Sequence, residues 1–141
     1  MAFDGSDAAV IAALLLQSAL GAIGTQALPP AGCAAYLWSR TEPPLLVAMA
    51  TAAPGSLRIS LDGKTVDLPR TGAEGAAARG LSATSRYTAG AVVATLDMSA
   101  VERPDLSDGA VVPQAVLTVT RPGADLIIAP VAGLIGCGPG K

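Results

Sequence analysis

The strongest structural signal in the chain is the stretch LRISLDGKTVDL, which runs from Leu57 to Leu68. Asp62-Gly63 lies at its centre, between two runs in which apolar and polar residues alternate. Asp-Gly suits the centre of a two-residue type I′ turn, because both central residues of that turn need positive φ. The stretch is therefore predicted to form a β-hairpin that turns at Asp62-Gly63.

A turn at this position also fixes which residues of the hairpin oppose each other. The predicted pairs are Ile59–Val66 and Leu57–Leu68 on one face, and Arg58–Asp67 and Ser60–Thr65 on the other. The first face is apolar, and the second carries an opposite-charge pair and a hydroxyl pair, as cross-strand pairing favours. An isolated hairpin is only marginally stable in water, so its apolar face must be covered by more sheet.

The chain after Cys33 predicts that additional sheet. Short strand-like runs alternate with turn residues, at 35–39, 45–50, 111–120 and 126–131, and as a second hairpin over 81–98. The second hairpin is expected to turn at Ala89-Gly90, with Tyr87 opposite Val92, and Pro122-Gly123 suits the centre of a type II turn. Residues 69–80 are predicted to be a loop because they are rich in glycine and alanine.

These patterns predict an all-β fold, an antiparallel sandwich or small barrel of about eight short strands. An apolar N-terminal helical segment is expected to precede it. A chain of 141 residues is long enough for one domain with a moderate core. Because only 3% of the residues are aromatic, Val, Leu, Ile and Ala must build that core.

Composition also excludes several classes of function. The chain has no histidine, which removes Ser-His and Cys-His nucleophiles and every His-containing zinc site. Two cysteines cannot form a four-thiolate zinc site. The net charge is −2 and the basic residues are scattered, so nothing predicts a nucleic-acid partner.

The run from Ala8 to Leu20 is apolar except for Gln17 and Ser18, and its length is typical of the apolar core of a secretory signal. Cleavage after Ala27 would leave a single β domain over 28–141, with no stable membrane span after processing. Residues 1–7 hold two aspartates and no Lys or Arg, whereas a secretory signal begins with positive charge. The alternative is a retained helix over 7–23 that packs on the domain or between copies.

The two cysteines, Cys33 and Cys137, bracket the predicted β domain almost end to end. A disulfide between them is expected, because both lie in Gly-flanked terminal segments and the ends of a domain are often close together. A disulfide implies an oxidising compartment, so a periplasmic or extracellular location is expected. Residues 31–33 also resemble the end of a lipoprotein signal, but Pro30 stands where leucine is usual.

Two groups of acidic residues are candidate sites. Asp105, Ser107 and Asp108 could offer oxygen ligands to calcium, but they lack the length and ligand count of an EF-hand loop. Asp97 and Glu102 could form a carboxylate pair for acid–base chemistry. Capping of turns and solvated surface charge explain both groups better.

Two further groups lie in predicted strands. Ser85-Arg86-Tyr87 has no general base nearby in sequence, and ordinary strand alternation explains it. Tyr36 and Trp38 share one strand face and could bind a sugar or an apolar ligand, although burial in the core is the better interpretation. We therefore assign no catalytic, cofactor or metal site.

The sequence favours a small exported cell-envelope protein with a binding or structural role and no catalytic activity. Its overall composition is similar to that of many small exported bacterial proteins, a likeness that assigns no function to any residue. The expected partner is an envelope protein or a second copy. Two alternatives remain, namely an assembly subunit that retains the helix over 7–23 and, less favoured, a carboxylate-dependent hydrolase.

Overall fold

The structure is a computed structural model, and it describes residues 19–103, 105 and 109–139. Its strands are β1 (Leu20–Gly21), β2 (Cys33–Ser39), β3 (Leu46–Thr51), β4 (Ser56–Leu61), β5 (Lys64–Ala78), β6 (Leu81–Ala89), β7 (Val92–Glu102), β8 (Gly109–Thr120) and β9 (Ile127–Cys137).

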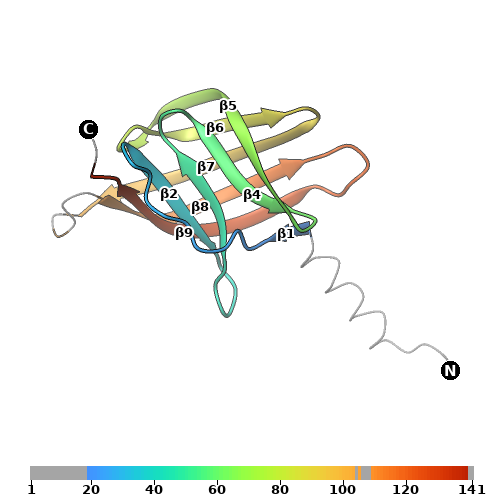
Figure 1. The fold of residues 1–141 in the computed structure, drawn as a ribbon, viewed down its shortest axis with the longest axis horizontal. Coiled ribbons are helices and arrows are strands. Elements are labelled where there is room, and N and C mark those ends of the chain that lie inside the picture. The colour runs from blue at the N-terminus through green and yellow to red at the C-terminus, as the bar shows by residue number, and fades with distance from the viewer. Residues whose placement is uncertain (1–18, 104, 106–108, 140–141) are drawn as a thin grey trace.

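Strands β2 to β9 form a closed antiparallel barrel (Figure 1). Each strand pairs with the next along the chain, and β9 pairs with β2 to close the wall. The short strand β1 pairs with β4 as an addition to the eight barrel strands. The all-β prediction is confirmed, and of the two predicted architectures the chain adopts the barrel.

The predicted helix over 7–23 is wrong at its C-terminal end, because Leu20-Gly21 is the strand β1 and pairs with Ser60-Leu61. Residues 7–18 lie outside the described part of the chain. Backbone pairing with β4 outweighs the helical propensity of this short apolar segment.

The central hairpin, β4–β5, has the predicted register. Asp62 has φ 51° and Gly63 has φ 82°, as a type I′ turn requires. Arg58 opposes Asp67, and its Nε and Nη2 donate to the two carboxylate oxygens at 2.8 and 3.1 Å. The hydrogen bond from Arg58 lowers the pKa of Asp67 below its usual value.

The core lies inside the barrel, because alternate residues of every strand point inward. The largest side chains that are fully buried are Tyr87, Leu37, Leu57, Ile59, Leu68, Leu96, Leu117, Ile135, Val112, Val119 and Val131. The one aromatic residue of this set, Tyr87, opposes the small residue Ala94 across the β6–β7 pair. At this position a large residue thus faces a small one, which helps the side chains fill the interior of a small barrel.

Two predictions about the chain between 69 and 92 are wrong. The expected loop over 69–80 is the second half of the long strand β5, with irregular register near Gly72. Pairing with β6 forms this strand despite the weak β propensity of glycine and alanine. The turn expected at Ala89-Gly90 falls at Gly90-Ala91, so Tyr87 opposes Ala94 instead of Val92, because Gly90 takes the positive φ of 58°.

Residues 22–32, which we call the strap, cross the outside of the barrel between β1 and β2. The Ile23 amide donates to the Leu46 carbonyl at 2.9 Å, and the Ile23 side chain is buried. Arg58 Nη1 donates to Gln26 Oε1 at 2.8 Å, and the Gly138 amide donates to the Gly32 carbonyl at 2.8 Å. The strap is therefore attached to the wall from its beginning to its end.

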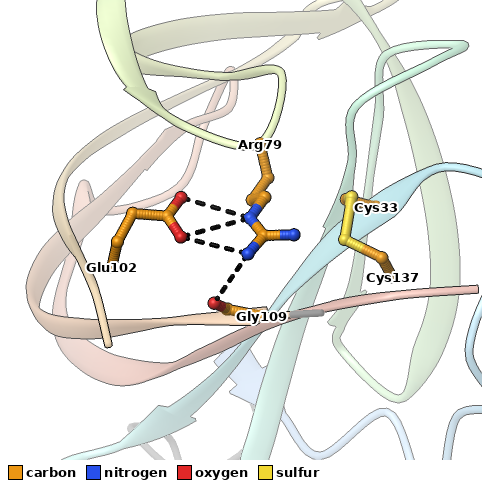
Figure 2. The surroundings of a disulfide bond; sticks show 5 residues. All are labelled: Cys33, Arg79, Glu102, Gly109 and Cys137. Carbon is orange, nitrogen blue, oxygen red and sulfur yellow. Dashed lines mark hydrogen bonds and ion pairs between the residues drawn. A yellow bond between two sulfur atoms is a disulfide. The ribbon is translucent and has the colours of Figure 1, made fainter. Parts of the chain in front are cut away.

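A disulfide joins Cys33 and Cys137, as predicted (Figure 2). The two residues oppose each other directly in the β2–β9 pair, and their Cα atoms are 4.0 Å apart. Both cysteines lie in strands, whereas irregular segments were expected. The bond crosses the pair of strands that closes the barrel.

We expect Ile59→Asp to unfold the domain, because it places a charge without a partner in the apolar interior. Ile59 is fully buried, and the loss in unfolding free energy should be about 4 kcal/mol or more. Thr65→Asp, at an exposed position of the same hairpin, is the control and should change stability little. Thermal melting measures both variants, and an Ile59→Asp protein that melts at the wild-type temperature would contradict the assigned core.

The double variant Cys33→Ser/Cys137→Ser should lower the free energy of unfolding by about 2–5 kcal/mol, because the bond closes a loop of roughly 100 residues in the unfolded chain. Urea denaturation without reductant measures this loss. Thiol counting on the unfolded, non-reduced wild type should find no free thiol. Two free thiols, or an unchanged urea midpoint in the double variant, would show that the bond does not form.

Candidate functional site

The two ends of the barrel differ in chemistry. The disulfide end carries Cys33, Cys137, the β3–β4 and β5–β6 turns and the β7–β8 loop. The opposite end carries the β2–β3 loop, the β4–β5, β6–β7 and β8–β9 turns, and β1. We call this second end the basin end, after the cavity described below.

An arginine clamp holds the turns of the disulfide end together (Figure 2). Arg79, which has a positive φ of 55° at the end of β5, donates from Nε and Nη2 to the carboxylate of Glu102, with N–O distances of 3.1 Å. Its Nη2 also donates to the Gly109 carbonyl at 3.4 Å. The clamp thus joins the β5–β6 turn to the end of β7 and the start of β8, which is a structural role.

Each of the three acidic candidates that the structure describes has a partner of its own. Glu102 pairs with Arg79, whereas Asp97 accepts a hydrogen bond from Thr84 Oγ1 at 2.8 Å on the neighbouring strand. Asp105 forms an exposed ion pair with Arg103 at 3.3 Å. Asp97 and Glu102 therefore each engage a different residue and do not form a carboxylate pair with each other.

The calcium hypothesis remains a prediction, because Ser107 and Asp108 lie outside the described residues. Within residues 19–103, 105 and 109–139, no group of three or more Cys, Asp or Glu side chains is placed to hold a metal ion.

Tyr36 and Trp38 lie on the outer face of β2, on the side away from the barrel interior. Tyr36 is buried under the strap, and its hydroxyl donates to the Ala27 carbonyl at 3.0 Å. Burial raises the pKa of this hydroxyl. Trp38 is half-buried. Tyr36 is therefore buried, as expected for this pair. It is covered by the strap, however, and does not lie in the core of the barrel.

Ser85 and Tyr87 point into the barrel, while Arg86 between them is exposed on the outside. Burial raises the pKa of Tyr87, and the Ser85 hydroxyl and the Arg70 charge act in the opposite direction. Tyr87 Oη and Arg70 Nη1 are buried without a hydrogen-bond partner among the described residues. None of these side chains lines the cavity at the basin end.

That cavity is an open apolar basin of about 760 Å³. It is lined by Ala19, Leu20, Gly21, Ser39, Arg40, Thr41, Leu45, Val47, Asp62, Arg121, Asp125, Leu126, Ile127, Ile128, Ala129 and Pro130. Three of its apolar residues are strongly exposed: Leu45 (47%), Leu126 (54%) and Ile128 (63%). Its volume falls in the range of cavities that bind ligands, about 300–1,000 Å³.

The basin exists because neighbouring strands of the wall differ in length. β2 ends at Ser39, which opposes Val131, whereas β9 begins earlier in the chain, at Ile127. The segment 127–130 therefore pairs with β8 on one side and has no strand on its other side within the described chain. Strand β1, which pairs with β4, lines the same cavity as this segment.

Charged residues lie among the apolar ones in the lining of the basin. Arg121 Nη1 forms an ion pair with Asp62 Oδ2 and so joins the β8–β9 turn to the β4–β5 turn. Arg40 donates to the Pro113 carbonyl at 3.4 Å, and Asp125 also contributes to the lining. The basin therefore combines an apolar surface with charges of both signs.

Reasoning from sequence did not find this site. Asp62 was interpreted only as a turn residue, and Leu126 and Ile128 only as members of a strand. The one signal in the sequence was that the apolar runs differ in length. The run over 126–131 follows a turn, and no segment of alternating polar and apolar residues flanks it.

The lining of the basin suits the binding of an apolar group better than acid–base catalysis by carboxylates. Asp62 and Asp125 are two carboxylates in one cavity, but Arg121 engages Asp62 and most of the lining residues are apolar. The hydrolase alternative therefore remains a prediction without further support. No helix among the described residues has the length and apolarity needed to span a bilayer.

The disulfide also bears on the lipidation alternative. The Cys33 sulfur is bonded to Cys137, so it is not available for the thioether of a lipoprotein.

Comparison of the chain with models of known protein families, with curated proteins and with solved structures gave no match.

Proposed function

We propose that this chain is a binding module without catalytic activity, and that the apolar basin is the surface through which it binds. The observation that carries the proposal is the gap beside 127–130, which leaves apolar side chains exposed around a cavity of about 760 Å³. Exposed apolar residues that converge on one concavity are typical of a binding site.

The proposed place of action is the periplasm or the extracellular space, in the cell envelope. The Cys33–Cys137 disulfide supports an oxidising compartment, because such bonds are rare in the cytosol. The apolar run over 8–20 supports export.

The structure supports retention of the strap in the mature protein. Cleavage after Ala27 would remove β1, the Gln26 partner of Arg58 and the Ala27 carbonyl that accepts from Tyr36. It would also remove Ala19, Leu20 and Gly21 from the basin wall. We propose that processing leaves residues 19–27 in place, because these residues contribute β1 and part of the basin wall.

Apolar binding can be tested with the fluorescent dye 1-anilinonaphthalene-8-sulfonate at submicromolar protein. The wild type should bind the dye saturably, and Ile128→Asp should weaken binding about tenfold by placing a charge in the basin wall. Leu134→Asp is the matched control, because Leu134 is an exposed residue of the same strand (46%) outside the basin. Equal dye affinity in the two variants would contradict the basin as the binding surface.

Retention of the strap can be tested by intact mass of the protein purified from its own cells. The measured mass should include residues 19–27, because β1 pairs with β4 and the strap is hydrogen-bonded to β3. A mature chain that begins at Leu28 would contradict retention and would favour cleavage at the site expected from sequence.

A further inference from the structure

We infer that the barrel binds a small monovalent anion, represented by chloride, between the side chains of Arg70 and Tyr87 on the inward face of β5 and β6. Neither residue lines the basin, so this site is separate from that cavity. An anion at Arg70 and Tyr87 is also independent of the binding role proposed for the basin.

Arg70 and Tyr87 oppose each other directly across the β5–β6 pair, so their side chains lie on the same face of the sheet. That face is the interior of the barrel. Leu68, two residues before Arg70, is buried there, and so is Ser85, two residues before Tyr87. Tyr87 is fully buried, whereas Arg70 is half-buried. Part of the Arg70 side chain is therefore accessible to solvent, which gives a small ion a route to the pair.

Each of these two side chains carries a buried polar atom that is unpaired. Tyr87 Oη and Arg70 Nη1 have no hydrogen-bond partner among the described residues. No ion pair of the described chain includes Arg70. Asp67, the carboxylate nearest to Arg70 in sequence, is engaged by Arg58. Nearly all buried polar groups in proteins have a partner, so two unpaired groups on adjacent strands indicate a ligand that contacts both.

The chemistry of the two groups selects an anion. The guanidinium of Arg70 is always charged, and burial raises the pKa of the Tyr87 hydroxyl, so both are hydrogen-bond donors at neutral pH. A negative ion accepts from both donors and also compensates the buried charge, whereas a water molecule leaves that charge uncompensated. The ion must be small, because the barrel interior is filled by fully buried side chains, among them Leu68.

The backbone at Gly55 provides the space that the Arg70 guanidinium occupies. The Arg70 amide donates to the Gly55 carbonyl at 3.0 Å, which brings the two residues together. A Cβ atom at position 55 would lie 2.5 Å from Arg70 Cζ and 2.6 Å from Nε. Only glycine at this position therefore leaves the guanidinium where it is, with Nη1 buried.

Chloride binding can be measured on the full chain in two ways. The wild type should broaden the chloride NMR line. Its urea midpoint should rise with sodium chloride relative to sodium gluconate at equal ionic strength, because gluconate carries the same charge on a much larger ion. Above the dissociation constant, the folding equilibrium constant should increase about tenfold for each tenfold increase in chloride. Arg70→Gln should lose both effects, whereas Arg86→Gln, which removes an exposed arginine of β6, is the control that retains them.

A second variant removes the site without changing the charge of the protein. Gly55→Ala should displace the Arg70 guanidinium and abolish the line broadening. Gly72→Ala is the matched control, because its added methyl group would make an ordinary contact, 3.8 Å from Arg86 Cβ. It should bind chloride as the wild type does. This pair of variants keeps the test decisive if Arg70→Gln fails to fold.

Tyr87→Phe distinguishes a bound anion from an unpaired hydroxyl. If Oη donates to an anion, the variant should bind chloride about tenfold more weakly and be less stable than the wild type in chloride. If Oη has no ligand, loss of the hydroxyl leaves stability unchanged or raises it, and that result overturns the anion site. A wild type that leaves the chloride line sharp also overturns it, as does equal chloride binding by Arg70→Gln and Arg86→Gln.

Discussion

Pairing of β2 with β9 is the constraint on which the rest of the structure depends. Every other strand pair of the barrel joins neighbours along the chain, whereas this pair joins strands about 100 residues apart and thereby removes both free edges of the sheet. The contact is close, since a side chain at Gly133 would overlap the Tyr36 carbonyl oxygen. The Cys33–Cys137 bond fixes the register of this pair at one end.

The basin follows from the same pair of strands. At the disulfide end β2 and β9 oppose each other residue for residue, but β2 stops at Ser39 and β9 extends four residues beyond that level, to Ile127. The wall is therefore complete at one end and open at the other. Strand β1 lines part of the opening, and the apolar residues that remain exposed there are the basis of the proposed binding role.

Local signals in the sequence predicted the parts of the fold that local chemistry decides. Asp62-Gly63 determined the turn and register of the central hairpin, and the two cysteines predicted the bond between the first and last strands of the barrel. The strand over 69–78 was missed because its glycines and alanines have little β propensity, and only pairing with β6 makes it a strand. The basin was missed because it depends on where β2 and β9 end relative to each other, which no local pattern reports.

The position of the closing strands also determines when the domain can fold. The pairing of β2 with β9 is the one pairing in the barrel between strands far apart in the sequence, and β2 is synthesised long before β9. Until residues near Cys137 are available, β2 has β3 as its only neighbour and the apolar interior has no complete wall. The chain is thus unable to complete its native sheet before β9 has been synthesised.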